Sequence, residues 1–159
     1  MKQLGFTLIE LLVAIGIILL VVSLGLVNYL KFNDQKKLEQ SYELVMQSVA
    51  DAQNSARSGK MRGCNALLAY EINFTGNLIT ITPRCANNTS GEINQIELSS
   101  GVVFIDNQSL FIQPISGLIF DNLNFQGQDL FVVILNLFKD NTLLTMNITQ
   151  VGAVTLVEN

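Results

Sequence analysis

Residues 6–30 form an almost uninterrupted apolar stretch. No charged residue occurs from Leu11 to Leu30, and about 20 apolar residues are enough for a helix to cross a bilayer. The pattern therefore predicts a membrane-spanning helix over residues 6–30. A cleavable secretory signal would have a shorter apolar region and a small-residue exit, whereas this stretch ends at Asn28-Tyr29-Leu30-Lys31-Phe32. A plain membrane anchor is the simpler alternative, because Tyr29 suits a membrane interface.

Residues 31–59 continue this helix with a single apolar face. Apolar positions recur at alternating spacings of four and three, as in an amphipathic helix. They are Leu38, Tyr42, Val45, Val49, Ala52 and Ala56. Gly59 follows as a C-terminal stop, so we expect one helix from Phe6 to Ser58, about 80 Å long at ~1.5 Å per residue. A coiled-coil partner would use the same stripe, but the stripe is short for a coiled coil.

Residues 60–159 change to a period of two and predict a β-rich head. A β-hairpin comes first, because apolar and polar residues alternate on both sides of the turn Thr75-Gly76-Asn77. The alternating apolar residues are Tyr70, Ile72 and Phe74 before the turn and Ile79 and Ile81 after it. Further strands are expected near residues 96–98, 102–105, 109–113, 118–120, 130–137, 142–149 and 153–157, with a polar loop at 83–92.

The strand at Leu130–Leu137 contains a single polar residue, Asn136, and is predicted to be buried on both faces. Short strands after one long helix indicate an α+β fold. We therefore expect a long N-terminal membrane-spanning helix that packs on a mostly antiparallel β-sheet head.

The composition removes several classes of function. The chain has no histidine, which excludes imidazole base chemistry and histidine metal ligands, and its two cysteines are too few for a zinc or iron–sulfur site. No Gly-x-Ser-x-Gly motif or phosphate-binding loop occurs. We assign no catalytic residue, metal or cofactor, and we do not expect an enzyme.

The charge distribution argues against binding of nucleic acid by the head. The net charge is −4, and beyond residue 62 only Arg84 and Lys139 are basic, against eight acidic residues. Such a surface does not attract phosphate backbones.

One carboxylate lies inside the front edge of the apolar stretch. Glu10 directly precedes the uncharged residues, and a carboxylate in a membrane helix is costly and usually functional. A plain anchor does not explain it. The charges that flank the stretch argue weakly for the opposite orientation. Lys31, Lys36 and Lys37 follow the apolar stretch, and the positive-inside rule then weakly favours the orientation with the head inside.

The stretch Gly5-Phe6-Thr7-Leu8-Ile9-Glu10, after a short leader with one lysine, resembles the processing motif of type IV pilins and type II secretion pseudopilins. The resemblance covers the leader, residues 1–5, and the apolar segment. It implies that a prepilin peptidase cuts after Gly5 and N-methylates Phe6. It also implies that Glu10 pairs with the N-terminal amine of a neighbouring subunit during assembly.

The same resemblance implies a location and partners. The protein would sit in the cytoplasmic (inner) membrane as a single-pass chain, with its N-terminus in and its head out, surrounded by membrane lipid. It would then enter a pilus or pseudopilus together with other pilin subunits and an inner-membrane assembly platform.

The last third of the head is similar to H-type minor pseudopilins and to the minor pilins that share this head. The similarity rests on "IELSSGVVF", "SLFIQPISGLIF" and "LLTMNITQVGAVTLVEN", which ends in a hairpin with a glycine turn. It implies a minor pilin or pseudopilin. A major pilin-like subunit, a DNA-uptake minor pilin and a single-pass membrane-anchored binding protein are the alternatives. Major pilins often close a C-terminal loop with a disulfide, and no cysteine follows Cys85. In a binding protein, the polar loops at 83–92 and 106–109 would be the contact sites.

Cys64 and Cys85 offer one disulfide. The bond would tie the helix exit to the sheet and close a loop of about 20 residues, which contributes about 3 kcal/mol. An extracytoplasmic head favours the bond, although two packed thiols fit the same sequence.

Arg57, Lys60 and Arg62, with Arg84 further on, form the chain's basic cluster. The DNA-uptake minor pilins suggest a contact with nucleic acid. We favour a solvated helix end with favourable dipole placement, because four charges beside an acidic head form a weak phosphate site.

Overall fold

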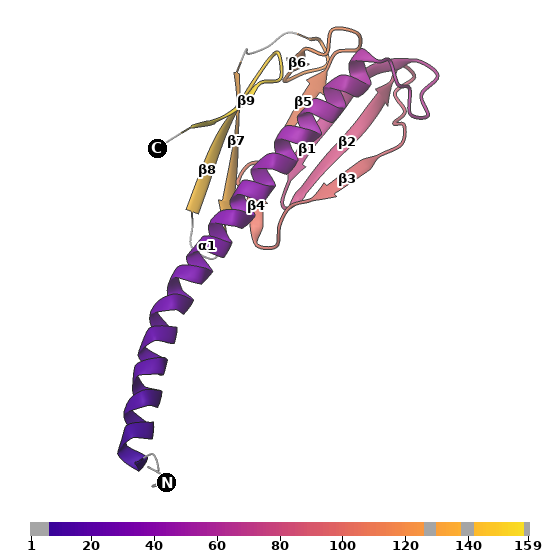
Figure 1. Cartoon of the computed structure of the whole chain (residues 1–159). Coiled ribbons are helices and arrows are strands. Elements are labelled where there is room, and N and C mark those ends of the chain that lie inside the picture. Colours follow the sequence, from indigo (N-terminus) through magenta and orange to yellow (C-terminus); the bar gives the residue numbers. More distant parts are fainter. Residues whose placement is uncertain (1–6, 126–129, 138–141, 158–159) are drawn as a thin grey trace. The chain divides into compact units, whose positions relative to one another are not determined.

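The computed structural model describes residues 7–125, 130–137 and 142–157, without the side chains of residues 24–28, 130 and 137. Helix α1 (Leu8–Arg57) is followed by nine strands among these residues (Figure 1). It begins just after Thr7 and ends one residue before the predicted Ser58. The chain divides into two compact units, residues 1–36 and 37–159, which are described separately below.

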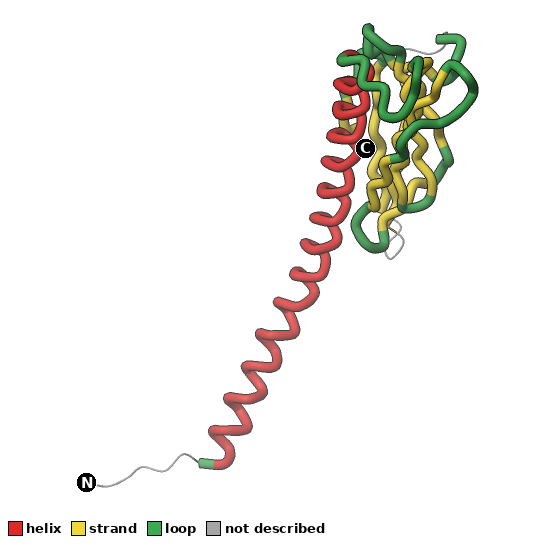
Figure 2. Tube along the Cα trace, turned by 90° about the vertical axis from the view of Figure 1, so that its right-hand side faces the viewer, coloured by secondary structure: helices red, strands yellow, loops and turns green. Residues whose placement is uncertain are grey.

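The predicted apolar stripe of residues 38–56 is confirmed and is buried in the head's own core. Leu38, Val45, Val49, Ala52 and Ala56 are buried, and Tyr42 packs against them partly exposed. Figure 2 shows this part of the helix lying along one side of the strands. The strands of the same chain therefore cover the stripe, and the helix needs no coiled-coil partner to bury it.

The C-terminus of helix α1 is closed by backbone hydrogen bonds that require a residue in the left-handed backbone conformation. Gly59 has a φ of 62°, its N–H donates to the Ala56 carbonyl at 3.1 Å, and the Lys60 N–H donates to the Ser55 carbonyl at 3.1 Å. This pair of bonds is a Schellman motif, which satisfies carbonyls that the helix leaves open. The predicted stop at Gly59 is confirmed.

The first sheet has the order β3-β2-β1-β5-β6, and all its neighbouring strands are antiparallel. Its strands are β1 (Leu67–Thr75), β2 (Leu78–Cys85), β3 (Asn94–Glu97), β5 (Gln108–Ile112) and β6 (Ile119–Phe120). The predicted hairpin is confirmed, with Thr75 opposite Leu78. The predicted start of the polar loop at residue 83 is wrong, because Pro83 still lies in strand β2, opposite Tyr70. Its carbonyl accepts a bond from the Gly91 N–H at 2.9 Å.

The second sheet has the order β4-β7-β8-β9 and is also antiparallel. Its strands are β4 (Val102–Phe104), β7 (Leu130–Leu137), β8 (Thr142–Thr149) and β9 (Val154–Val157). The prediction that residues 130–137 are buried on both faces is wrong. Phe131, Val133 and Leu135 are buried, whereas Val132 between them is 47% exposed. An antiparallel sheet can leave one face open, and the run of apolar residues concealed this alternation.

The chain passes from the first sheet to the second between β3 and β4. β3 pairs with β2, and β4 pairs with β7, although a short turn joins β3 to β4. The Phe104 N–H donates to the Gly76 carbonyl at 2.7 Å, which holds β4 beside the β1–β2 turn. The expected α+β class is confirmed as a helix packed on antiparallel sheets.

A buried glutamine near the C-terminus of α1 links the two sheets. The Gln53 amide donates to the Gly117 carbonyl at 2.8 Å and to the Val151 carbonyl at 3.0 Å. Gly152 beside it has a φ of 89°, and a Cβ there would overlap the Gln53 amide. A side chain at residue 152 would therefore strain the turn and displace this link.

Candidate processing and assembly site

The N-terminal site is described from Thr7 onward, so the predicted processing residues Gly5 and Phe6 lie outside the described residues. Thr7 caps the helix. Its hydroxyl accepts a bond from the Glu10 N–H at 3.4 Å, and its carbonyl accepts from Glu10 at 3.1 Å and from Leu11 at 3.2 Å. The spacing Thr7-x-x-Glu10 is that of a capping box. Sequence reasoning missed this role of Thr7, although the spacing signals it.

The Glu10 side chain is exposed among exposed apolar side chains. Leu8 is 78% exposed and Ile9 68%, and the large apolar residues described up to Val22 are all exposed. A surface of this kind needs an apolar partner or medium. Within the described residues, no helix has a stretch that is both long and apolar enough to cross a membrane. The membrane-spanning character of residues 6–30 therefore remains a prediction.

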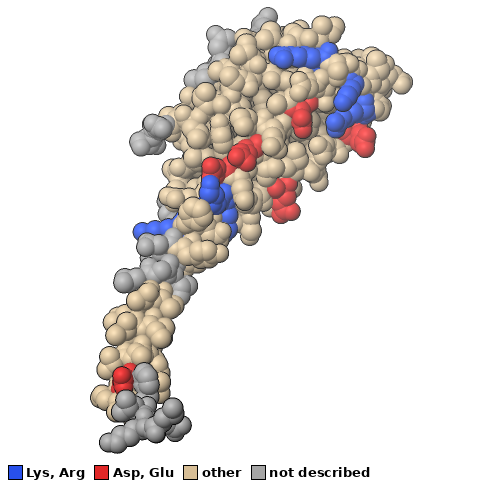
Figure 3. All heavy atoms as spheres, in the orientation of Figure 1, with Lys and Arg blue, Asp and Glu red and all other residues tan. Residues whose placement is uncertain are grey.

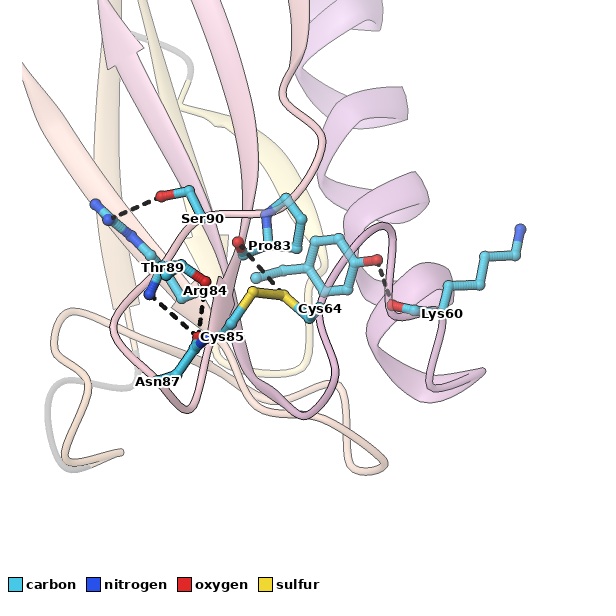
Figure 4. The surroundings of a disulfide bond; sticks show 9 residues. Lys60, Cys64, Pro83, Arg84, Cys85, Asn87, Thr89 and Ser90 are labelled. Carbon is cyan, nitrogen blue, oxygen red and sulfur yellow. Dashed lines mark hydrogen bonds between the residues drawn. A yellow bond between two sulfur atoms is a disulfide. The ribbon is translucent and has the colours of Figure 1, made fainter.

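Cys64 and Cys85 form a disulfide with their Cα atoms 5.3 Å apart. Figure 4 shows the bond between the segment after the helix and the end of β2. Both cysteines are buried. The bond therefore fixes the helix exit to the first hairpin.

The segment after Cys85 is tightly hydrogen-bonded. The Cys85 N–H donates to the Thr89 carbonyl at 2.9 Å, and the Glu92 N–H donates to the Arg62 carbonyl at 2.8 Å. The Asn87 side chain accepts from the Thr89 hydroxyl at 2.7 Å (Figure 4). A Cβ at Gly91 would overlap the Arg62 carbonyl. The part of the predicted polar loop that follows Cys85 is therefore fixed by hydrogen bonds within itself and to Arg62.

The predicted basic residues are engaged in different ways. Arg84 pairs with Glu71, a buried carboxylate of β1. The Arg57 side chain donates to the Ser116 carbonyl at 3.3 Å. Lys60 is exposed and Arg62 partly exposed. Figure 3 shows basic side chains in separate places on the face in view, with acidic side chains nearby. Two of the four positive charges are therefore committed to contacts within the chain.

A hollow of about 330 Å³ lies beside the disulfide. The apolar side chains of Leu68, Phe111 and Leu123 form part of its wall, and Arg84 is its charged residue. Because Arg84 is already paired with Glu71, this hollow offers no uncompensated charge to an anionic ligand.

Tyr70 lies buried beside the helix exit, where its hydroxyl donates to the Lys60 carbonyl at 2.7 Å. Burial raises the pKa of Tyr70 above its ordinary value of 10.0, against smaller opposing effects of the Arg62 charge and a hydrogen bond with Ser55. The folded head therefore holds the phenol proton at a pH where the unfolded chain releases it.

We expect the free energy of unfolding to fall as the pH rises above about 10.0, by up to about 1.4 kcal/mol per pH unit from Tyr70. Below that pH this contribution is fully present. Urea unfolding of Tyr70→Phe at about pH 8 and about pH 11 should show a smaller pH dependence than the wild type. Tyr42→Phe is the matched control. An unchanged pH dependence in Tyr70→Phe would contradict the assignment.

Residues 1–26 match the family model described as the prokaryotic N-terminal methylation motif. The chain carries the N-terminal signal of a type IV pilin-like precursor. The resemblance drawn from Gly5 to Glu10 is confirmed by this match. The similarity of the head to H-type subunits is not shown, because the match ends at residue 26. No curated protein and no solved structure matches the chain.

The exposed apolar residues Leu8 to Val22 lie within the matched segment. The motif implies processing by a prepilin peptidase and assembly with other pilin subunits. The motif is typical of structural subunits.

Proposed function

We propose that this chain is a minor pilin or pseudopilin, a structural subunit of a type IV pilus or type II secretion pseudopilus. A prepilin peptidase cuts it after Gly5 and methylates Phe6, and the chain then assembles through Glu10. The observation that carries the proposal is the methylation motif at residues 1–26, together with a carboxylate at the start of an exposed apolar helix.

The physical role of Glu10 follows from its surroundings. A lone carboxylate among apolar side chains is costly, and so is a lone ammonium, whereas the two attract strongly when they meet in such surroundings. A subunit with an unpaired Glu10 therefore gains by docking beside a neighbour's methylated N-terminus. This pairing would fix the axial position of each new subunit.

Two features of the head support the proposal that the chain is a minor subunit. It ends in the β8–β9 hairpin with its glycine turn, as in the H-type resemblance. Its disulfide ties the helix exit to β2 and does not bound a C-terminal loop. The disulfide also suits a head outside the cytosol, which agrees with a single-pass chain whose N-terminus lies inside.

Intact mass of the membrane-extracted chain tests the proposal. With a co-expressed prepilin peptidase, we expect loss of residues 1–5 and gain of one methyl group on Phe6. A catalytically inactive peptidase is the control and should leave the full mass. A chain that keeps Met1 or Lys2 at its start in the presence of the active peptidase would leave only a plain membrane anchor.

A further inference from the structure

Five triplets of the form Asn-x-Ser/Thr occur in the chain, and in a secreted protein such a triplet can accept a glycan on the asparagine amide. Their asparagines are Asn73, Asn87, Asn88, Asn107 and Asn147. The structure describes all five. It separates them by the exposure of the asparagine and by the partner of the hydroxyl group at the third position.

Two of these asparagines lie within strands. Asn73 is in β1 between β2 and β5, where its side chain accepts a bond from the Ser109 hydroxyl. Asn147 is in β8, and the hydroxyl of Thr149, which completes its triplet, is bonded to Ala153. Both asparagines are only partly exposed. A transferase would have to separate paired strands before it could use either amide.

Asn87 lies in the exposed turn after the disulfide, and its amide oxygen has two donors. The Thr89 hydroxyl donates to Asn87 Oδ1 at 2.7 Å, and the Thr89 N–H donates to the same atom at 3.3 Å (Figure 4). Both donors require an acceptor, so the oxygen faces them and the amide nitrogen Nδ2 lies on the other side. Within the described residues, Nδ2 has no hydrogen-bond partner. The nitrogen that would carry a glycan is therefore accessible.

The other two exposed asparagines lack this bond. Asn88 is next in the same turn, but the Ser90 hydroxyl that completes its triplet accepts a bond from an arginine of β2 at 3.4 Å. Asn107 precedes β5, and the Ser109 hydroxyl of its triplet donates to a residue of β1. Among the five described triplets, Asn87 alone is bonded to the hydroxyl of its own third residue.

We propose that Asn87 is an N-glycosylation site, which receives a glycan from a polyprenyl diphosphate donor through a membrane oligosaccharyltransferase. Nδ2 bonds to C1 of the first sugar, the C1–O bond to the diphosphate breaks, and the Nδ2 proton passes to a base of the transferase. As this proton leaves, negative charge spreads onto Oδ1, where the two Thr89 donors stabilise it. The inference rests on the proposed function in one respect, that the head lies outside the cytosol.

Co-expression of the full chain with a single-subunit oligosaccharyltransferase and its lipid-linked glycan tests the site. A flexible Asn-Ala-Thr tag after Asn159 reports whether the head reaches the transferase, and peptide mass spectrometry measures the glycan occupancy of each asparagine. We expect the occupancy of Asn87 to exceed that of Asn107, the matched exposed control, at least about fivefold. A glycan on the tag without one on Asn87 would overturn the proposal.

Asn87→Gln separates the effect of the hydroxyl bond from that of exposure. It removes the proposed acceptor and leaves the triplet Asn88-Thr89-Ser90 intact in the same turn. We expect this variant to carry at least about fivefold less glycan on the head, whereas Thr89→Ser, which keeps the hydroxyl donor, should remain modified at Asn87. Transfer to Asn88 in Asn87→Gln at the wild-type yield would show that exposure alone selects the site, against the proposal.

The tag and the processing site give separate readouts. An unmodified tag would show that the head stays inside, which would overturn both this site and the proposed orientation. Loss of residues 1–5 is measured on the same samples by intact mass. Failure of glycan transfer with normal cleavage after Gly5 and a modified tag therefore contradicts only the glycosylation site.

Discussion

Replacing Glu10 by Gln is expected to remove the chain from filaments while leaving it in the membrane. The amide has nearly the same shape but cannot pair as an anion with a neighbour's amine. Removing one partner of a buried ion pair costs about 3–5 kcal/mol, which corresponds to a loss of more than about 100-fold in incorporation. The measurement is the ratio of subunit in sheared filaments to subunit in membranes.

Two companion variants separate the charge of Glu10 from its part in starting the helix. Gln serves a capping box as well as Glu does, so Glu10→Gln keeps the local helix start. Thr7→Ala removes the cap, at a cost of about 1 kcal/mol, and keeps the carboxylate. We expect Thr7→Ala to assemble and both Glu10→Gln and Glu10→Ala to fail. If Glu10→Gln assembles normally while Thr7→Ala fails, Glu10 acts through the capping box and not through its charge.

Removing the disulfide is expected to lower the free energy of unfolding of the head by about 3 kcal/mol. The bond closes a loop with a sequence separation of 21 and holds the helix exit against β2. A typical domain is stable by only about 5–15 kcal/mol, so this loss is a large fraction. The measurement is urea unfolding of the full chain in detergent, which compares the wild type with Cys64→Ala/Cys85→Ala. Tyrosine fluorescence follows the unfolding, because the chain has no tryptophan.

The wild type under reductant is the matched comparison for this double variant, because it breaks the bond without changing side-chain volume. Both should unfold at a lower urea concentration by a similar amount. A change below about 0.5 kcal/mol in the reduced wild type would show that the segment after Cys85 is held by its backbone hydrogen bonds alone.

The sequence by itself determined the features that depend on neighbouring residues. The stripe from Leu38 to Ala56 predicted the buried helix face, Gly59 predicted the helix end, and alternation around Gly76 predicted the first hairpin. The motif from Gly5 to Glu10 predicted the pilin-like signal. Each of these is a local pattern, because helix periodicity, turn chemistry and a peptidase motif are all written within a few residues.

The tertiary structure decided the features that depend on distant partners. Pairing of β3 with β2 and of β4 with β7 separates two segments that one short turn joins. The alternation of buried and exposed side chains along Leu130–Leu137 is decided by the packing of one face of the sheet on the core. The bond from Cys64 to Cys85 also joins two separate segments, the exit of the helix and the end of β2. A local pattern fixes which way a side chain points along its own strand, but only the packed fold decides which strand lies beside it.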